Sequence, residues 1–424
     1  MSGANALFFA SKLTHQTTFK PRYATLGFLY DQTDEPIDQA IVLYFQAPFS
    51  FTGEDVVEFQ CHGGSIVAHL VLETLLACGV RLALPGEFSK RAFLNGKMDL
   101  SKAEAIASLI ESRSVDAVKI LMRQIKGELK DFVHRVRESL VEMLAFVEVN
   151  IDYAEEDLPL DLLQTIEQKL LSLQGELLKI YESSKRRQGL MQGFKVAIVG
   201  KPNVGKSSLL NKLLSYERAI ISDIAGTTRD TIEEELRIGT HLVKIIDTAG
   251  IRQANDVVEK IGIERSLQAV QEAEIIIAMF DNSRVCDGED EAILELLHTH
   301  ATQKHVINVL NKADLPKAFE CPKLGDSLLI SCQDSAETII QKVQQILDIA
   351  TNDDTMMLTS LRQLDAVKKA YEAISKTTPL LNQGELELFA FHINEAIEAI
   401  ASITNPFERH EILDKMFGNF CLGK

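Results

Sequence analysis

The stretch GKPNVGKS, residues 200–207, constrains this chain more than any other part of its sequence. It fits the pattern G-x-x-x-x-G-K-[ST] and lies between an apolar run, KVAIV, and a helix-like segment, SSLLNKLL. This context predicts a strand, a phosphate-binding loop and a helix in direct succession. Gly200 and Gly205 would let backbone N–H groups turn toward phosphate oxygens. Lys206 would reach the β and γ phosphates, and Ser207 would offer its hydroxyl to Mg²⁺.

A second motif indicates which base the nucleotide carries. The sequence NKAD, residues 311–314, follows the apolar run HVINVL. The Asp314 carboxylate can accept hydrogen bonds from both N1–H and the exocyclic amine of guanine, whereas adenine offers no such donor pair. We expect Asn311 and Lys312 to hold this loop and the backbone of Ser331-Cys332 to contact the guanine O6. In this order and spacing the motifs resemble those of the translation-factor-like GTPases, which usually have Ser-Ala where this chain has Ser-Cys.

Two further segments would complete the phosphate and metal site. DTAG, residues 247–250, ends the run HLVKII, so Asp247 would hold Mg²⁺ through water and Gly250 would contact the γ-phosphate. Upstream, SDIAGTTRD, residues 222–230, supplies Thr228 as a second hydroxyl for Mg²⁺.

The position after DTAG lacks the glutamine that many small GTPases use to orient the attacking water. Ile251 stands there instead and can form no hydrogen bond through its side chain. Either hydrolysis is slow, or another group positions the water. The candidates are Arg252 and Glu259, although Glu259 also fits a solvated carboxylate near the start of a helix.

The residues expected to bind GTP all belong to these motifs. They are Asn203, Val204, Gly205, Lys206, Ser207, Ser208, Ser222, Asp223, Ile224, Ala225, Gly226, Thr227, Thr228, Asp247, Thr248, Ala249, Gly250, Asn311, Lys312, Ala313, Asp314, Ser331 and Cys332. The expected catalytic residues are Glu259, Lys206 and Arg252.

The rest of the chain changes character from region to region. Residues 1–97 mix short β-like runs (AIVLYFQ, VVEFQCH, VRLAL) with Gly and Pro, which predicts a small α+β domain. Residues 98–192 and 350–424 have helical periodicity, and residues 193–349 alternate strands with helices as in a doubly wound sheet. The predicted fold class is therefore multidomain, with an N-terminal α+β domain and an all-α helical domain split by an inserted Ras-like P-loop G domain.

Composition excludes several classes of protein. The net charge of −17 argues against a protein that mainly coats nucleic acid. The six cysteines include no CxxC pair, which favours a reducing cytoplasm over a disulfide framework or a zinc site. No apolar run approaches the ~20 residues of a membrane-spanning helix. We therefore expect a cytoplasmic protein without a membrane span.

Two charged stretches leave alternatives open. KRRQ, residues 185–188, is the densest basic patch and would be either a tRNA contact or a solvated linker. IDYAEEDLPLD, residues 151–161, is acidic and fits a solvated loop.

Longer motifs in every region resemble one family. They are SFTGEDVVEFQCHGG, PGEFSKRAFLNGKMDL, IDYAEED, GxPNxGKSS, DIAGTTRD, DTAGIR…VEKIGIER and the final FCLGK. Over nearly its full length the chain resembles the bacterial MnmE (TrmE) tRNA modification GTPases. The resemblance implies a tetrahydrofolate-binding N-terminal domain that forms a homodimer. It also implies an FAD-containing partner, MnmG, in a heterotetramer or larger complex, which forms 5-carboxymethylaminomethyluridine at the wobble uridine (U34) of tRNA.

The resemblance also implies roles for single residues. Asn203 would bind K⁺ together with Ser222, Ile224 and Thr227, close to the phosphates, where a cation can neutralise charge that develops in phosphoryl transfer. Glu259 would orient the attacking water, which answers the question raised by Ile251. Mg²⁺ would be held by Ser207 and Thr228.

The implied folate site draws on both ends of the chain. Glu58, Lys97 and Lys424 match family residues that bind 5-formyltetrahydrofolate, and Cys421 is a candidate for the modification chemistry. Taken without the resemblance, Glu58 and Lys97 would be surface charges, and the CLGK end a frayed terminus.

One feature departs from the family. The chain opens at MSGANAL, where the family has a Gly-rich segment with an Arg before a Ser-Gly, so the family's Arg contact to folate has no counterpart. A sheet without this segment would expose an edge, which puts folate binding and the dimer in question. The rival function is a GTP-dependent switch in ribosome assembly or regulation, without one-carbon chemistry. Such a switch would have no need of Glu58, Lys97 or the CLGK end.

Overall fold

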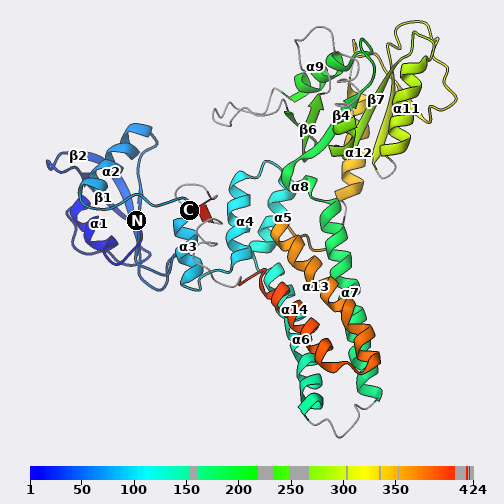
Figure 1. Ribbon diagram of the computed structural model, residues 1–424. Coiled ribbons are helices and arrows are strands. Elements are labelled where there is room, and N and C mark those ends of the chain that lie inside the picture. Colours follow the sequence, from blue (N-terminus) through cyan, green and yellow to red (C-terminus); the bar gives the residue numbers. More distant parts are fainter. Residues whose placement is uncertain are drawn as a thin grey trace, which may run out of the picture. The chain divides into compact units, whose positions relative to one another are not determined.

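The computed structural model divides into two compact units, which are described separately (Figure 1). The first unit comprises residues 1–111, 122–174 and 365–424, and the second comprises residues 112–121 and 175–364. The residues described are 1–152, 160–217, 233–247, 267–301, 304–333, 336–351, 353–405, 417–418 and 420.

The first unit begins with a small antiparallel sheet. Its strands, in the order β1-β2-β3, are β1 (Thr25–Tyr30), β2 (Pro36–Phe45) and β3 (Val56–Gln60). Alternation along the strands sends Leu29, Val42 and Val57 to one face. On that face they pack against α1 (Ala6–Thr14) and α2 (Ser65–Ala77). The opposite face carries apolar side chains that are exposed, among them Leu26 and Phe28.

One strand predicted from the sequence is absent. The run VRLAL, residues 80–84, forms no strand in this described part of the chain, and Leu82 and Leu84 are exposed. The Leu84 N–H donates to the Glu87 carboxylate instead of to a neighbouring strand (2.8 Å), and Pro85 follows directly. A side chain has therefore taken the backbone donor that a sheet would need.

The rest of the first unit is helical. Its helices are α3 (Glu87–Leu94), α4 (Leu100–Glu111), α6 (Glu128–Asp152) and α14 (Leu386–Ala401), together with parts of α5 (Val115–Ile125), α7 (Leu160–Arg186) and α13 (Leu361–Gln383). α14 packs along α6, so helices from the two flanks of the predicted insertion share one unit. Within the described ranges, no helix combines the length and apolar character that crossing a membrane requires.

The second unit is built on a six-stranded sheet in the order β5-β6-β4-β7-β8-β9. The strands are β4 (Phe194–Val199), β5 (Glu233–Ile238), β6 (His241–Asp247), β7 (Ile275–Asp281), β8 (His305–Asn311) and β9 (Ser327–Leu329). All neighbours are parallel except β5, which is antiparallel to β6. Strand order reverses around β4, and doubly wound sheets bind ligands beyond the carboxyl end of the strands at such a point.

Helices cover both faces of this sheet. α9 (Lys206–Glu217) and α12 (Glu337–Thr351) pack on the face that contains Val196 and Ile198. α11 (Gly288–His300) packs on the face that contains Ala197 and Val199. With both faces buried, β4 is apolar except for Lys195, and β7 is apolar except for Asp281 at its end, as expected for central parallel strands.

A buried arginine joins the two ends of this α/β region. Arg187, directly after α7, is 4% exposed and donates to the carbonyl oxygens of Asp353 and Thr355 at 2.6 Å each. The Ser183 hydroxyl donates to the Asp353 carboxylate at 2.6 Å, and this bond helps to lower the pKa of Asp353. We call this cluster the arginine knot. The sequence predicted that KRRQ is either a tRNA contact or a solvated linker. For Arg187 both predictions are wrong, because its side chain is buried and holds the backbone of residues 353–355.

We predict that Arg187→Ala lowers the free energy of unfolding of the second unit by about 3 kcal/mol. The substitution leaves buried carbonyl oxygens without their charged donor. Thermal or urea unfolding measures the loss. Arg186→Ala, which removes the exposed neighbouring arginine, should change stability by only about 0.5 kcal/mol. Equal effects of the two substitutions would contradict the structural role of Arg187.

Candidate nucleotide-binding site

The loop that follows β4 has the backbone of a phosphate-binding loop. Gly205 has φ +107°, and a Cβ at this position would lie 2.2 Å from the Asn311 amide nitrogen. Asn203 adopts φ +65°, a left-handed conformation that Asn tolerates better than most residues. The Lys206 ammonium group donates to the carbonyl oxygens of Gly200 (2.7 Å) and Lys201 (2.9 Å). The ammonium is thus held at the loop.

Asn311 connects this loop to the predicted guanine-binding loops. It ends β8 and is 3% exposed. Its amide Nδ2 donates to the Val204 carbonyl oxygen at 2.7 Å, and its Oδ1 accepts the Cys332 backbone N–H at 3.0 Å. One side chain therefore fixes three sequence motifs relative to one another. In this structure the Cys332 N–H, which we expected at the guanine O6, is engaged by Asn311.

Lys312 is held next to it. It has φ +65°, and its ammonium group donates to the Asp281 carboxylate at 2.6 Å. Burial would raise the pKa of Asp281, but hydrogen bonds from Lys312 and Ser283 outweigh it and lower the pKa. The two following residues differ in exposure, because Asp314 is exposed and Ala313 is half-buried. Asp314 is thus free to meet a base.

Sequence analysis missed a buried lysine in the phosphate loop. The side chain of Lys201 is 7% exposed and lies 2.6 Å from Asp287 and 2.7 Å from Asp290. Burial alone would lower the pKa of Lys201, but the two carboxylates outweigh it and raise the pKa. Asp287 also caps α11 in a capping box with Asp290. The lysine therefore fixes the loop to a helix on the other side of the site. Its position inside the motif was visible, but the acidic pair lies 86 and 89 residues away.

The metal side of the site is described only in part. Ser207 is exposed in the first turn of α9, and Asp247 ends β6 opposite Ile198 of β4. Both therefore lie at the carboxyl edge of the sheet, beside the phosphate loop. The predicted residues Ser222–Thr228, Thr248–Gly250, Arg252 and Glu259 lie outside the described residues.

The first unit contains the predicted folate residues that the structure describes. Glu58 is exposed on β3, opposite Leu43. Lys97 is exposed after α3, and its side chain lies against Gly53, where an added Cβ would be 3.1 Å from the lysine Cε. Lys424 and Cys421 lie outside the described residues.

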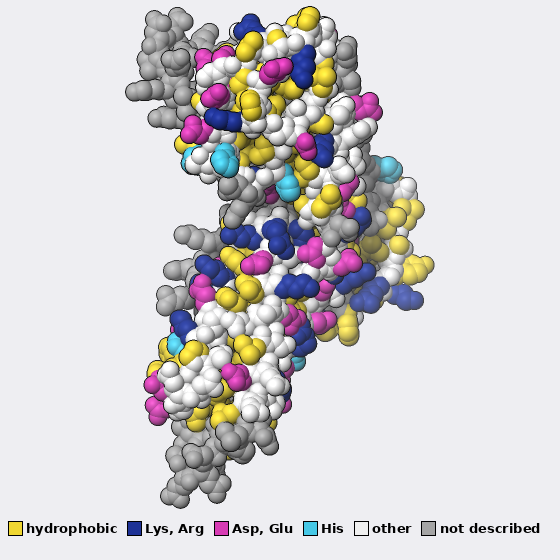
Figure 2. All heavy atoms as spheres, turned by 90° about the vertical axis from the view of Figure 1, so that its right-hand side faces the viewer, with side chains coloured by type: hydrophobic (Ala, Val, Ile, Leu, Met, Phe, Trp, Pro, Cys, Tyr) yellow, Lys and Arg dark blue, Asp and Glu magenta, His cyan; other side chains and the backbone are white. Residues whose placement is uncertain are grey.

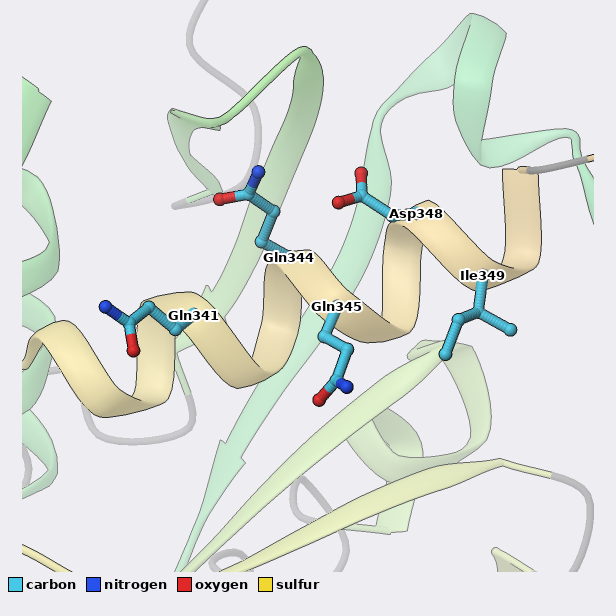
Figure 3. A pocket seen from close by; sticks show the side chains of 5 residues that line it. All are labelled: Gln341, Gln344, Gln345, Asp348 and Ile349. Atoms are coloured by element: carbon cyan, nitrogen blue, oxygen red, sulfur yellow. The ribbon is translucent and has the colours of Figure 1, made fainter.

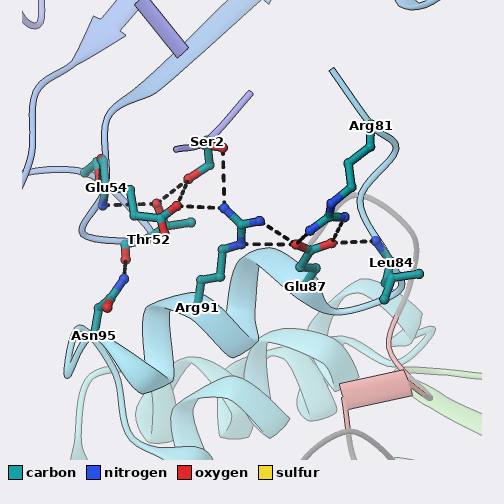
Figure 4. A network of polar contacts seen from close by, with 9 residues as sticks. Ser2, Thr52, Glu54, Arg81, Leu84, Glu87, Arg91 and Asn95 are labelled. Atoms are coloured by element: carbon teal, nitrogen blue, oxygen red, sulfur yellow. Dashed lines mark hydrogen bonds and ion pairs between the residues drawn. The ribbon is translucent and has the colours of Figure 1, made fainter. Parts of the chain in front are cut away.

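A polar network fixes the loop that packs against Lys97. Arg91 donates to Glu54 (2.8 Å) and pairs with Glu87, while Asn95 donates to the Thr52 carbonyl oxygen at 2.7 Å (Figure 4). Hydrogen bonds, the strongest from Arg81, lower the pKa of Glu87 to about 2. The network ties residues 52–54 to α3.

The described C-terminal residues pack near the same segment. Phe417 and Phe420 form one cluster with Phe93, Met98 and Leu100. Gly86, with φ +65°, has no room for a Cβ because the Phe417 carbonyl oxygen would be 2.3 Å away. The residues on either side of Lys97 are thus in contact with the chain immediately before Cys421.

The structure also shows an aspartate–histidine pair that sequence analysis missed. Asp38 accepts from the His62 backbone N–H (2.9 Å) and lies 2.8 Å from its ring Nδ1. No spacing in the sequence signals the pair, because antiparallel pairing of β2 and β3 brings the two residues together.

Comparison with known proteins shows the family. A model of the TrmE N-terminus, described as a GTP-binding protein, matches residues 1–97, and the MnmE helical domain matches residues 100–421. The proteins named tRNA modification GTPase MnmE from Sulfurimonas denitrificans and Nitratiruptor sp. are 58% and 60% identical over 424 residues. These matches cover 100% of this chain and 95% and 94% of the relatives.

This chain belongs to the MnmE (TrmE) family of tRNA modification GTPases. The family and the multidomain fold class expected from the sequence are confirmed. Among solved structures, Aquifex aeolicus Era bound to GDP and AlF4⁻ is 30% identical, with a TM-score of 0.28. That match covers 42% of this MnmE-family chain and 66% of Era.

We predict that Asn311→Ala weakens GDP binding by on the order of tenfold or more, because it leaves the Val204 carbonyl and the Cys332 N–H unpaired next to the nucleotide. Titration of a fluorescent GDP analogue measures the affinity. Cys332→Ala is the matched control. It should stay within about twofold of the parent, since the bond to Asn311 uses the Cys332 backbone alone. A tight-binding Asn311→Ala variant would refute the bridging role.

Proposed function

We propose that this chain binds GTP beyond β4 and hydrolyses it within a complex that modifies C5 of the wobble uridine of tRNA. The observation that carries the proposal is the Asn311 bridge, which joins the loop of residues 200–207 to the two loops that we propose contact guanine. Membership of a family whose relatives are named tRNA modification GTPases supports the tRNA part.

The proposed phosphate chemistry follows from the donors that the site holds. Lys206 neutralises charge on the β and γ phosphates, and Asp314 reads guanine. Ser207 fits Mg²⁺, because its hydroxyl is exposed in the first turn of a helix beside Asp247, and hard oxygen donors suit this ion. Thr228 would supply the second hydroxyl. When bound at these hydroxyls, Mg²⁺ would supply positive charge against the charge that builds up during phosphoryl transfer.

K⁺ would add a further positive charge beside Lys206 and Mg²⁺. Asn203 is exposed in the phosphate loop, and its left-handed backbone is a strained conformation of the kind that clusters at functional sites. Its amide oxygen is a suitable ligand for K⁺, together with oxygens from Ser222, Ile224 and Thr227. Glu259 would orient the attacking water, and Arg252 is a further candidate for that role.

For the one-carbon chemistry, we propose that the first unit binds a folate of the 5-formyltetrahydrofolate type. Glu58 suits the donor-rich edge of a pterin, and Lys97 suits the glutamate tail. Packing of Phe417 and Phe420 beside Phe93 and Met98 supports a site that Lys424 and Cys421 also reach.

The remaining parts of the proposal concern partners. The exposed apolar face of the N-terminal sheet, which includes Leu26, Phe28 and Ile41, supports a homodimer through this region. An FAD-containing partner, MnmG, would supply the flavin and most tRNA contacts. On the face seen in Figure 2, Lys and Arg side chains are interspersed with acidic and hydrophobic ones, and the net charge is −17, which fits shared RNA binding in the cytoplasm.

We predict faster GTP turnover in KCl than in NaCl at equal ionic strength, since only K⁺ would fill the Asn203 site. Phosphate release measures the rate. Asn203→Ala should remove the preference for K⁺. Glu259→Ala should keep GTP binding and lose most turnover in either salt. Equal rates of the parent in the two salts would overturn the cation site and favour a generic switch.

We also predict that the chain binds 5-formyltetrahydrofolate and that Glu58→Gln and Lys97→Met each weaken binding by about tenfold, or ~1.4 kcal/mol. Calorimetric titration measures the affinity. Lys130→Met, at an exposed lysine on α6, is the matched control and should leave it unchanged. A parent chain that shows no affinity for folate would refute the one-carbon role and leave GTP hydrolysis standing.

A further inference from the structure

The tip of the β5–β6 hairpin is held by two helices that are far apart in the sequence. The Thr240 hydroxyl donates to Asp116 of α5 at 2.6 Å, and His241 Nε2 lies 2.8 Å from the Asp348 carboxylate of α12. We call these four residues the hairpin clasp. All of them belong to the second unit, because residues 112–121 group with it and not with the helices that follow.

His241 is the buried centre of the clasp. It is 1% exposed, and its ring packs edge-on against Phe194 of β4, with the centroids 5.8 Å apart. Within the described part of the chain, its Nδ1 has no hydrogen-bond partner and lies 3.9 Å from Asp116 Oδ2. A hydrogen bond needs about 3 Å, so His241 Nδ1 and this carboxylate oxygen stand about 1 Å beyond bonding distance.

Further contacts surround the hairpin backbone. The Ser114 hydroxyl donates to the Thr240 carbonyl oxygen at 3.1 Å, and Arg113 pairs with Glu235 of β5. On the other side, Gly239 has φ +62°, and an added Cβ would lie 2.9 Å from Gln344 Nε2.

α12 contributes neighbouring side chains to the surroundings of the clasp. Gln344 and Asp348 point to the same side of this helix (Figure 3). Both are among the α12 residues that line an open cavity of about 390 Å³.

The end of the hairpin opposite its tip lies at the predicted nucleotide-binding motifs. β5 begins at residue 233, directly after the motif of residues 222–230, and β6 ends at Asp247, which opens DTAG. β5 is an edge strand that pairs only with β6 among the described strands. Leu236 and Ile238 anchor β5 in the core, and the clasp holds the tip. Since β6 is hydrogen-bonded to both β5 and β4, one continuous sheet connects the tip to the edge at which Asp247 lies.

We propose that Thr240 and Asp116 are positioning residues for GTP hydrolysis. They anchor the hairpin whose strand β6 ends at Asp247, at the sheet edge beside the phosphate loop, and they couple this hairpin to α5. The inference rests on the GTP hydrolysis proposed above. It adds a mechanical link between the nucleotide motifs and a helix that precedes the α/β region by some 70 residues of sequence.

The first test compares variants at Thr240. Thr240→Val removes the hydroxyl and keeps the shape, so kcat for GTP should fall by roughly tenfold while KM stays within about twofold. Thr240→Ser keeps the hydroxyl and should restore the rate. Thr299→Val is the matched control, because the Thr299 hydroxyl bonds only within α11, to the Glu295 carbonyl oxygen, and it should match the parent.

The second test needs nucleotide binding but no turnover. Hydrogen exchange of α5 amides is compared between the GDP state and the GDP–AlF4⁻ state in KCl. The parent should show a difference in protection, and Thr240→Val should abolish it while melting cooperatively and binding GDP. A Thr240→Val variant with the parent's kcat and the parent's exchange difference would overturn the clasp. A parent that binds GDP without hydrolysing GTP would refute the proposed function, and the exchange difference would still decide the clasp.

Discussion

The α/β region of this chain depends on one buried guanidinium group. Arg187 meets the chain as it enters the region and bonds to carbonyl oxygens of Asp353 and Thr355 as it leaves. Burying a cation is costly unless its donors are satisfied, and the fork of an arginine can reach several carbonyl oxygens at once. The entry and exit of the nucleotide-binding region are thus held at a single point, next to α8 (Gly189–Gln192) and β4.

Several polar side chains of the nucleotide site bond to other protein groups and so hold the site's loops in place. Lys201 lies inside the phosphate-loop motif, yet its ammonium group forms ion pairs with Asp287 and Asp290. Asn311 uses its amide on protein groups of two other motifs. These bonds hold the loop in a conformation with left-handed residues, whose strain must be offset by the surrounding structure. The motif supplies the chemistry, and residues distant in sequence supply the geometry.

The sequence predicted the parts of the fold that follow from local pattern. β4 and β8 were visible as the apolar runs KVAIV and HVINVL, because buried parallel strands are apolar on both faces. β5 was missed, since Glu233, Glu234 and Glu235 hide the alternation that buries Leu236 and Ile238. VRLAL was mistaken for a strand because its apolar alternation was weighed above two local signals, Pro85 directly after it and Glu87, whose carboxylate takes the Leu84 N–H. The motifs also located the nucleotide site, but the partners of Lys201 and Arg187 lie more than 80 residues away and follow from topology alone.

The arginine knot and the hairpin clasp should respond differently to force. The knot uses a buried charged donor with short bonds to backbone carbonyls, so breaking it leaves buried groups unpaired. The clasp includes a bond from the exposed Thr240 to a partly exposed carboxylate, and the buried His241 Nδ1 has no hydrogen-bond partner among the described residues. A movement that starts at the phosphates would therefore rearrange the clasp first and leave the knot intact. The entry and exit of the region would then serve as a pivot, and α5 would be the element that the hairpin moves.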